Sequence, residues 1–361
     1  MLSKGSKIVR SVSFSPDGTR LASADADRMV RLWDVASGQQ LHTLEGHSTY
    51  VTSVSFSPDG TRLAAASGEV FRRANSRPGD LKVWDVASAT ELMTLNTAGS
   101  TILSVVFSTD AALLATGSMD GRISLWNADN GQKVRTLEGH SSQVTCVMFG
   151  PDSEKLASAS EDGTMKLWTV ATGQELMKFT TERNPVNSLS FSPDGKRLAS
   201  AHHFGGIRVR ELARVDGAIT VIPALNRINS VSFSPDGRQL VSGGHNGVVN
   251  VWDAATGQQT LTLPGQDSSK INSVSFSPDG LRLVAANDRG TLKLWDARPW
   301  TPEHRVQAQT RSYLQLVRDR KPSLEELEMY IRDDKTISEE VRQQCQEWVE
   351  LFWKNRDTAG N

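Results

Sequence analysis

The chain has 361 residues, and its 40 basic and 41 acidic side chains give a formal net charge of −1. No overall field therefore draws it to nucleic acid or to a membrane surface. Its two cysteines, Cys146 and Cys345, are too few for a disulfide framework and fit a reducing compartment. Because the N-terminus lacks a signal-peptide pattern and no run approaches the ~20 apolar residues of a membrane span, we expect a cytoplasmic protein.

A pentapeptide, Phe-Ser-Pro-Asp-Gly, recurs along the chain. Full copies begin at Phe14, Phe56, Phe191, Phe233 and Phe276, and degenerate copies begin at Phe107 and Phe149. Successive copies lie 42, 51, 42, 42, 42 and 43 residues apart. A fixed period near 40 residues with strand-like contents indicates a repeat array of seven units.

The fourth unit shows the content of one repeat most clearly. Residues 144–149 form an apolar run typical of a buried strand, and residues 150–153 form a turn. Second and third strands are predicted over 155–160 and 164–168, and a more polar fourth strand over 174–179. Four antiparallel strands make a sheet with two faces to cover, and stacking copies around an axis covers both.

The predicted third strand ends in a large side chain. That residue lies 19 positions after the repeat phenylalanine in six units, at Trp33, Trp126, Trp168, Arg210, Trp252 and Trp295. In the second unit the interval is 28 residues and ends at Trp84, because nine extra residues lie within 67–80.

These motifs resemble those of the WD-repeat β-propeller family over roughly residues 5 to 300. The resemblance is carried by the pairs Trp33-Asp34, Trp84-Asp85, Trp252-Asp253, Trp295-Asp296, Gly46-His47 and Gly139-His140. It implies an all-β, seven-bladed β-propeller of four-stranded antiparallel blades over residues 1–308, with non-enzymatic, protein-binding use.

The resemblance also implies a buried hydrogen-bond network within a blade. The fourth unit has all of its members, His140, Ser158, Asp162 and Trp168, and the second unit keeps His47, Asp80 and Trp84. Other units place Ala98, Glu182, Ala224 and Gln266 near the histidine position, so we expect them to depend more on apolar packing.

Closure of the ring is harder to predict. Many relatives lend an N-terminal strand to the last blade, but residues 1–7 look too short for this, and the first unit opens directly with its inner strand over 8–14. We expect the last outer strand from residues 303–308 and a weaker seam. Alternatively, the chain is a piece of a longer protein or pairs its seam with another chain.

Helical signals follow over residues 309–361. Capping-box spacings at Ser323 with Glu326 and at Thr336 with Glu339 precede two apolar stripes, Leu324, Leu327 and Ile331 and then Val341, Cys345, Trp348 and Phe352. We favour helices that pack on one another or on the propeller edge; a docking helix or the start of a helical array is the alternative. The tail resembles helical segments that follow such propellers in large bacterial signalling proteins.

The sequence offers no catalytic motif. A phosphate-binding glycine loop, metal-binding Cys or His spacings and a kinase signature are missing, so we expect no enzyme, no cofactor and no metal. His202 and His203 are adjacent on a predicted strand and should face opposite sides. The arginines of the second-unit insertion, Arg72, Arg73 and Arg77, suit an acidic or phosphorylated peptide better than nucleic acid.

The loops between second and third strands should share a rim with those entering the inner strands. In relatives this rim is the common partner-binding face. It carries Tyr50, Arg72, Arg73, Met119, Glu161, His203, Phe204, Arg227, His245 and Lys270. Phe204 is either an exposed anchor or fills the gap left by the tryptophan missing from the fifth unit.

We therefore predict a scaffold that binds a protein or peptide partner on this rim. The alternative is a sensor or regulatory module of a larger signalling assembly, with a kinase or ATPase effector elsewhere. No nucleic-acid or membrane partner is expected.

Overall fold

The computed structural model describes residues 3–4, 7–69, 79–95, 97, 99–181, 184–204, 206–213, 219–222, 226–264, 269–296, 324–333, 339, 342–343 and 345–346. The chain divides into two units, Met1–Ala297 and Arg298–Asn361. The predicted boundary after residue 308 lies outside the described residues and stays a prediction.

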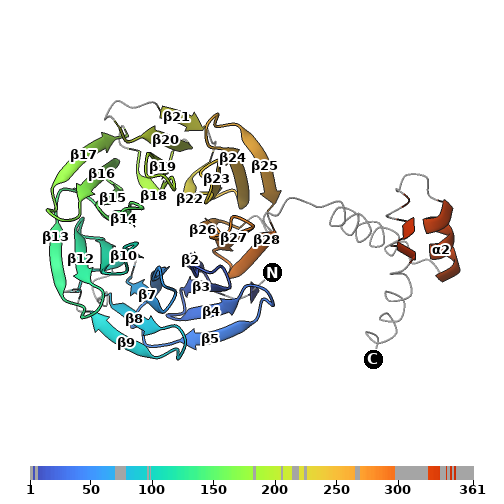
Figure 1. Ribbon diagram of the computed structural model, residues 1–361, viewed down its shortest axis with the longest axis horizontal. Coiled ribbons are helices and arrows are strands. Elements are labelled where there is room, and N and C mark those ends of the chain that lie inside the picture. The colour runs from blue at the N-terminus through green and yellow to red at the C-terminus, as the bar shows by residue number, and fades with distance from the viewer. Residues whose placement is uncertain are drawn as a thin grey trace. The chain divides into compact units, whose positions relative to one another are not determined.

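The first unit is a seven-bladed β-propeller in which every blade is a four-stranded antiparallel sheet (Figure 1). Blades 1 to 4 comprise β2 (Val9–Phe14), β3 (Arg20–Asp25), β4 (Val30–Asp34), β5 (Gln40–Leu44); β6 (Val51–Phe56), β7 (Arg62–Ser67), β8 (Leu81–Asp85), β9 (Glu91–Leu95); β10 (Ile102–Phe107), β11 (Leu113–Ser118), β12 (Ile123–Asn127), β13 (Lys133–Leu137); and β14 (Val144–Phe149), β15 (Lys155–Ser160), β16 (Thr164–Thr169), β17 (Glu175–Thr180).

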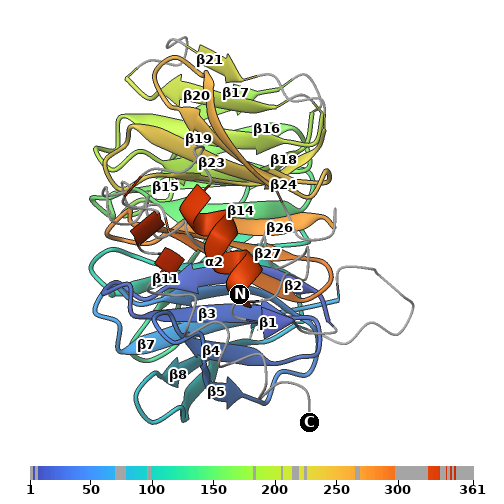
Figure 2. The ribbon, with the colours of Figure 1, turned by 90° about the vertical axis from the view of Figure 1, so that its right-hand side faces the viewer.

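Blades 5 and 6 repeat the same order, with β18 (Val186–Phe191), β19 (Arg197–His202), β20 (Ile207–Glu211), β21 (Ile219–Ile222), β22 (Ile228–Phe233), β23 (Gln239–Gly244), β24 (Val248–Asp253) and β25 (Gln259–Pro264). Blade 7 contains β26 (Ile271–Phe276), β27 (Arg282–Asn287) and β28 (Thr291–Asp296), and its fourth strand is β1 (Ser3–Lys4). Figure 2 turns the ring edge-on, so that several sheets are seen side by side.

The hydrophobic core lies in the layers between neighbouring blades. Second strands are built from small apolar residues and are almost fully buried, because a sheet stands on either side of them; Ala64, Ala65 and Ala66 are all 0% exposed. Each layer adds a large side chain from the third strand of the following blade. Trp84 of blade 2, for example, packs with Ala22 and other core residues of blade 1. The repeat tryptophans therefore join blades rather than fill them.

The turns between first and second strands form the lower rim and also join blades. A Cβ placed on Gly60 would lie 3.5 Å from Cδ of Pro16 in the preceding blade. Four more turn glycines meet the preceding turn proline in the same way, at Gly18 with Pro278, Gly195 with Pro151, Gly237 with Pro193 and Gly280 with Pro235. These glycines have φ between +68° and +71°, which favours glycine over other residues. The pentapeptide thus makes both a turn and a contact with the next blade.

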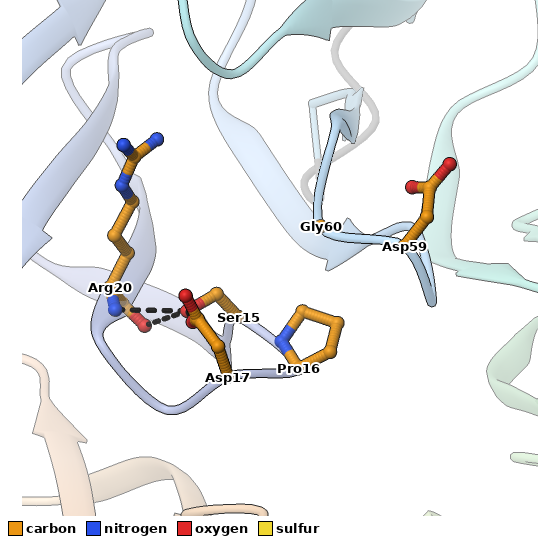
Figure 3. A pocket seen from close by; sticks show the side chains of 6 residues that line it. All are labelled: Ser15, Pro16, Asp17, Arg20, Asp59 and Gly60. Carbon is orange, nitrogen blue, oxygen red and sulfur yellow. Dashed lines mark hydrogen bonds between the residues drawn. The ribbon is translucent and has the colours of Figure 1, made fainter.

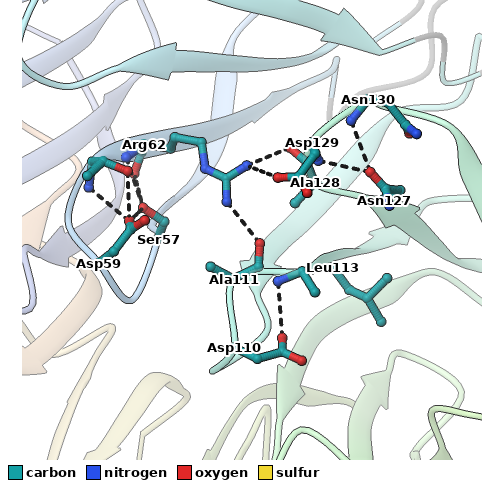
Figure 4. A network of polar contacts seen from close by, with 12 residues as sticks. Ser57, Asp59, Arg62, Asp110, Ala111, Leu113, Asn127, Ala128, Asp129 and Asn130 are labelled. Carbon is teal, nitrogen blue, oxygen red and sulfur yellow. Dashed lines mark hydrogen bonds and ion pairs between the residues drawn. The ribbon is translucent and has the colours of Figure 1, made fainter.

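Arg62 adds a polar contact between blades 2 and 3 on the same rim (Figure 4). Its guanidinium donates to the carbonyls of Ala128 at 2.8 Å and Ala111 at 2.9 Å, and it pairs with Asp129 at 2.9 Å. The side chain also lies over the Phe107 ring, 5.5 Å from its centroid. Two backbone carbonyls and a carboxylate of the next blade are therefore satisfied by one side chain.

The ring closes through the N-terminus, so the expectation that residues 1–7 are too short to contribute a strand is wrong. Ser3 and Lys4 pair with Leu292 and Thr291 of β28 as the fourth strand of blade 7. Two residues suffice because the chain entering blade 1 passes directly beside the free edge of the last blade. The seam is also joined by Asn272 Nδ2, which donates to the Val9 carbonyl at 2.9 Å. The proposed outer strand over 303–308 lies outside the described residues.

The second unit contains α2 (Leu324–Asp333), on which Ile331 is buried. Residues 339, 342–343 and 345–346 are also helical, and Cys345 is buried. The first capping-box spacing is therefore followed by a helix, as predicted, and the second helix stays a prediction. Ser323, Thr336, Val341, Trp348 and Phe352 lie outside the described residues.

Candidate binding surface on the upper rim

One backbone hydrogen bond, repeated in every blade, builds the upper rim. The N–H of the residue following the second strand donates to the carbonyl of the residue preceding the inner strand. The pairs are Ala26 with Ile8, Gly68 with Tyr50, Met119 with Thr101, Glu161 with Gln143, His203 with Pro185, His245 with Arg227 and Asp288 with Lys270, at 2.8–3.1 Å. Loops from two different places in each repeat therefore meet on one side of the ring.

The structure places eight of the ten predicted binding residues on this rim. They are Tyr50, Met119, Glu161, His203, Phe204, Arg227, His245 and Lys270. Arg72 and Arg73 lie outside the described residues. Partner binding at these positions is not established by their placement and stays a prediction.

Phe204 is 68% exposed, so the interpretation that it fills a gap inside blade 5 is wrong. Asn184 holds the backbone at this point from both sides: its Oδ1 accepts from the Phe204 N–H at 2.7 Å, and its Nδ2 donates to the Phe204 carbonyl. The Phe204 ring lies 4.4 Å from the His203 ring, centroid to centroid. The backbone is therefore held at a point from which the large apolar side chain faces solvent.

The gap in blade 5 is filled from elsewhere. Arg210 occupies the tryptophan position, and its guanidinium lies over the ring of Phe179 on the outer strand of blade 4, 5.3 Å from the centroid. The positions corresponding to Phe179 in blades 1 to 3 are leucines, Leu44, Leu95 and Leu137. The ring that stands in for the missing tryptophan in this layer is thus that of Phe179 from blade 4.

Blade 4 contains the complete buried network. Trp168 Nε1 donates to Ser158 Oγ at 2.8 Å, and Ser158 Oγ lies 2.7 Å from His140 Nε2. His140 Nδ1 lies 3.1 Å from Asp162 Oδ2. Burial acts to raise the pKa of Asp162, but hydrogen bonds from His140, Thr164 and the Ser141 N–H outweigh it and lower that pKa. The four predicted members therefore form one continuous chain of hydrogen bonds.

Blade 2 lacks one member of this chain. His47 Nδ1 hydrogen-bonds to Asp80, and the His47 ring stands edge-on to Trp84 with centroids 5.2 Å apart. Ala65 stands where blade 4 has Ser158, and His47 Nε2 is buried without a hydrogen-bond partner. Blade 2 therefore keeps the histidine–aspartate contact but not the link from that histidine through a serine.

In blade 5 a histidine reaches the serine by another route. His202, at the end of β19, is 0% exposed, and its Nε2 lies 2.9 Å from Ser200 Oγ. Burial, with the nearby charges of Arg208 and Arg210, lowers its pKa to about 4, so the buried ring is neutral at pH 7. His203, its neighbour, lies on the rim, and the two side chains do not form a joint metal site.

Sequence reasoning missed two residues of this surface, Arg10 and Asn184. Arg10 is recognised by comparison with three asparagines at the same repeat position. Asn187, Asn229 and Asn272 each donate from Nδ2 to the carbonyl of the first inner-strand residue of the next blade, at 2.7–2.9 Å. Arg10 occupies the corresponding position in blade 1; its Nε is buried without a hydrogen bond, and burial lowers its pKa while Tyr50 acts in the opposite direction. Comparison of the repeats at this one position would have revealed Arg10. Asn184, the other residue, carries no repeat signal.

A hollow on the lower rim is a weaker candidate for a binding site than the upper rim (Figure 3). It lies between blades 1 and 2 and is lined by Ser15, Pro16, Asp17, Arg20, Asp59 and Gly60. Its two carboxylates are engaged within their own turns, Asp17 by Ser15 and Thr19 and Asp59 by Ser57 and Thr61. These contacts fix the turns and leave the hollow a by-product of blade packing.

Among the described residues, no three His, Cys, Asp or Glu side chains gather as a metal site requires. No helix in the same residues is long and apolar enough to cross a membrane.

The fold and its repeats define a seven-bladed propeller with a variable upper rim, and comparison with known sequences supplies the family. Residues 120–311, just over half of the chain, match the family described as the IFT122 first beta-propeller. Residues 2–34, 38–85 and 89–127 match the WD domain, G-beta repeat. The chain belongs to the WD-repeat β-propellers, which generally serve as non-enzymatic platforms for protein–protein interaction.

Individual relatives match over about one repeat. A stretch of 40 residues, 11% of this chain, is 55% identical to a probable serine/threonine-protein kinase PkwA of Thermomonospora curvata. Protein Mut11 of Chlamydomonas reinhardtii is 55% identical over 42 residues, 12% of this chain, and the dynein assembly factor with WD repeat domains 1 of Xenopus laevis is 45% identical over 40 residues, 11% of this chain. The matched stretches cover 5%, 11% and 10% of those proteins.

Proposed function

We propose that this chain is a protein-interaction scaffold that binds a protein or peptide partner on its upper rim, without catalysis and in the cytoplasm. The observation that carries the proposal is the outward Phe204, which Asn184 holds by two hydrogen bonds to its backbone. A fixed, exposed aromatic side chain loses little conformational freedom when a partner covers it, and aromatic residues are common anchors of interfaces.

Tyr50 supports the same interpretation from another part of the rim. It is 43% exposed and belongs to the backbone pair that ties blade 2 together, Gly68 N–H to Tyr50 carbonyl at 3.0 Å. By contrast, the residues of the buried network and of the lower-rim turns are engaged with other parts of the chain. Binding and folding therefore depend on different side chains.

The test is an affinity capture with the intact chain and a triple variant, Tyr50→Ala, Phe204→Ala and His245→Ala. A matched control on the lower rim, Leu281→Ala with Arg238→Ala, removes exposed side chains from the opposite side. All three proteins should melt alike. The captured partner is then purified, and its binding to each of the three purified proteins is measured. It should bind the wild type and the control but not the rim variant. Equal binding by the rim variant would refute the proposal.

A second candidate is a regulatory module of a signalling assembly whose effector is a kinase. The supporting observation is the match of one repeat to a protein named as a probable serine/threonine-protein kinase. A neighbouring gene for a kinase or an ATPase, whose purified product binds this chain, would favour this candidate. A rim partner without any such effector would favour the simple scaffold.

A further inference from the structure

Basic side chains gather on the upper rim over blades 5 to 7. We call this set, His203, Arg227, His245 and Lys270, the basic sector. One backbone bond joins two members directly, because the His245 N–H donates to the Arg227 carbonyl at 3.0 Å; the Lys270 carbonyl accepts from the N–H of Asp288, which adjoins the sector. Arg227 is close enough to both histidines that its charge, together with burial, lowers their pKa values. The sector is therefore continuous across three blades.

Arg227 is half-buried and has no carboxylate within ion-pair distance among the described residues. Its Nη2 lies 3.4 Å from Asn187 Oδ1, a long contact, and its Nε is buried without a hydrogen-bond partner. Burial lowers its pKa, and the charge of Glu161 opposes that shift. A guanidinium offers a planar fork of donors that matches a carboxylate, and among the described residues this fork has only the Asn187 amide oxygen as an acceptor.

An apolar contact surface adjoins this fork. Phe204 lies 4.4 Å from the ring of His203, whose backbone N–H donates to the Pro185 carbonyl, and Arg227 Nη2 contacts Asn187, two residues after Pro185. A ligand that reached Arg227 from the solvent would thus meet Phe204 a short distance away. The sector offers an anion site and an apolar site in fixed relation to each other.

We propose that the basic sector binds an acidic segment of a protein partner, in which an Asp or Glu side chain pairs with Arg227 and a neighbouring apolar side chain packs on Phe204. This inference rests on the proposed function and names the chemistry of the partner. Lys270 and His245 lie farther along the same surface and give the segment its direction. The paired carboxylate supplies the charged acceptor that Arg227 lacks among the described residues.

A nucleic acid fits this surface less well than a short acidic segment. Glu161 adjoins the sector on blade 4 and Asp288 adjoins it on blade 7, so a long polyanion would meet a carboxylate at either end. The chain as a whole has a net charge of −1, which gives no general attraction to a phosphate backbone. The carboxylates of Glu161 and Asp288 therefore limit the anionic part of a ligand to the length of the basic sector.

The test is unbiased selection with a random dodecapeptide display library on the full chain and on Arg227→Gln with Lys270→Gln. Arg238→Gln with Lys196→Gln removes the same charge from exposed lower-rim positions and serves as the control. Peptides enriched on the wild type and on the control should carry Asp or Glu beside an apolar residue. Their affinity, measured by fluorescence anisotropy, should fall about 10-fold or more in the Arg227 variant and several-fold in Phe204→Ala.

Enrichment of neutral or basic peptides, of none, or of acidic peptides that bind the Arg227 variant equally well would overturn the inference. A phosphoserine analogue of the selected peptide is measured in parallel, and its binding in place of the acidic form would assign the sector to phosphopeptides and overturn the inference as stated. These failures differ from failure of the proposed function. A partner lost from the Tyr50, Phe204 and His245 variant but kept by the Arg227 variant would leave the scaffold intact with a different partner chemistry.

Discussion

Replacing Ser158 by alanine should destabilise the propeller more than any loss of packing volume explains. The hydroxyl accepts from Trp168 Nε1 at 2.8 Å and lies 2.7 Å from His140 Nε2. Trp168 is 2% exposed and the His140 side chain is 0% exposed, so water cannot replace the lost partner. A buried polar atom left without a hydrogen bond costs roughly 1–3 kcal/mol, and the substitution strands one such atom on each residue.

The sum for the two atoms, about 2–6 kcal/mol, is an upper range, because the pocket relaxes in part. Blade 2 shows that a blade forms with His47 Nε2 unpartnered, so we expect a loss near the lower end, about 2–3 kcal/mol. Urea unfolding followed by tryptophan fluorescence, with circular dichroism as a second probe, gives the free energy of unfolding. Coincident transitions for the two probes are required before wild type and variant are compared.

The matched experiment restores the missing hydroxyl in blade 2. Ala65→Ser places an oxygen where His47 Nε2 lacks a partner, and it should stabilise by up to about 1 kcal/mol, the net value of one hydrogen bond. Ala65 is 0% exposed, so the added atom must fit a close-packed layer and part of this gain is lost. A Ser158→Ala effect below about 0.5 kcal/mol, or an Ala65→Ser loss as large as that of Ser158→Ala, would refute the reasoning.

Three further predictions concern the same ring. Because burial lowers the pKa of His202 to about 4 in the fold, the unfolded chain binds more protons at this residue, and the contribution of His202 to stability should fall by up to about 3 kcal/mol as pH drops from about 6.5 towards 4, while Asp25, whose pKa burial raises to about 6, acts in the opposite direction. The difference between wild type and His202→Gln in urea unfolding isolates this contribution, and a difference that stays constant over that window would contradict it. Arg62→Gln should lower the free energy of unfolding in urea by about 1–3 kcal/mol, because Arg62 donates to two carbonyls of the next blade. The exposed Arg238→Gln serves as the control and should lower it by less than about 0.5 kcal/mol. Deleting residues 1–6 should speed amide exchange in β28, and equal exchange would show that β1 does not protect the seam.

The ring itself could be predicted from the sequence because the signal is repeated. A turn motif at a nearly constant interval and a tryptophan at a fixed distance specify the same four strands each time, and local errors in one copy are corrected by the others. The fourth unit shows this: the strands predicted over 144–149, 155–160 and 164–168 are found as Val144–Phe149, Lys155–Ser160 and Thr164–Thr169. The degenerate turn at Phe149 does not disturb them.

The features that escaped prediction depend on contacts between blades. β1 has only two residues, and its pairing with β28 follows from the position of the chain where the circle closes, not from a strand-like pattern. The direction of Phe204 could not be decided for a related reason. Whether blade 5 had room for its ring depended on Phe179 and Arg210, which meet across a blade boundary. A sequence pattern within one repeat does not report the filling of the layer that it shares with its neighbour.

The chain separates what it repeats from what it varies, and this separation supports a binding role for the upper rim. The repeated residues are engaged internally, since the lower-rim glycines meet the prolines of preceding turns and the third-strand tryptophans fill layers between blades. On the upper rim the backbone bond is repeated in every blade, while the side chains beside it range from Met119 to Glu161 to His245. A constant backbone frame that presents different side chains costs the fold little when those side chains change, so the rim is free to match a partner. The same reasoning accommodates the proposed pairing of Arg227, because the frame fixes its backbone while no carboxylate among the described residues lies within ion-pair distance of its guanidinium.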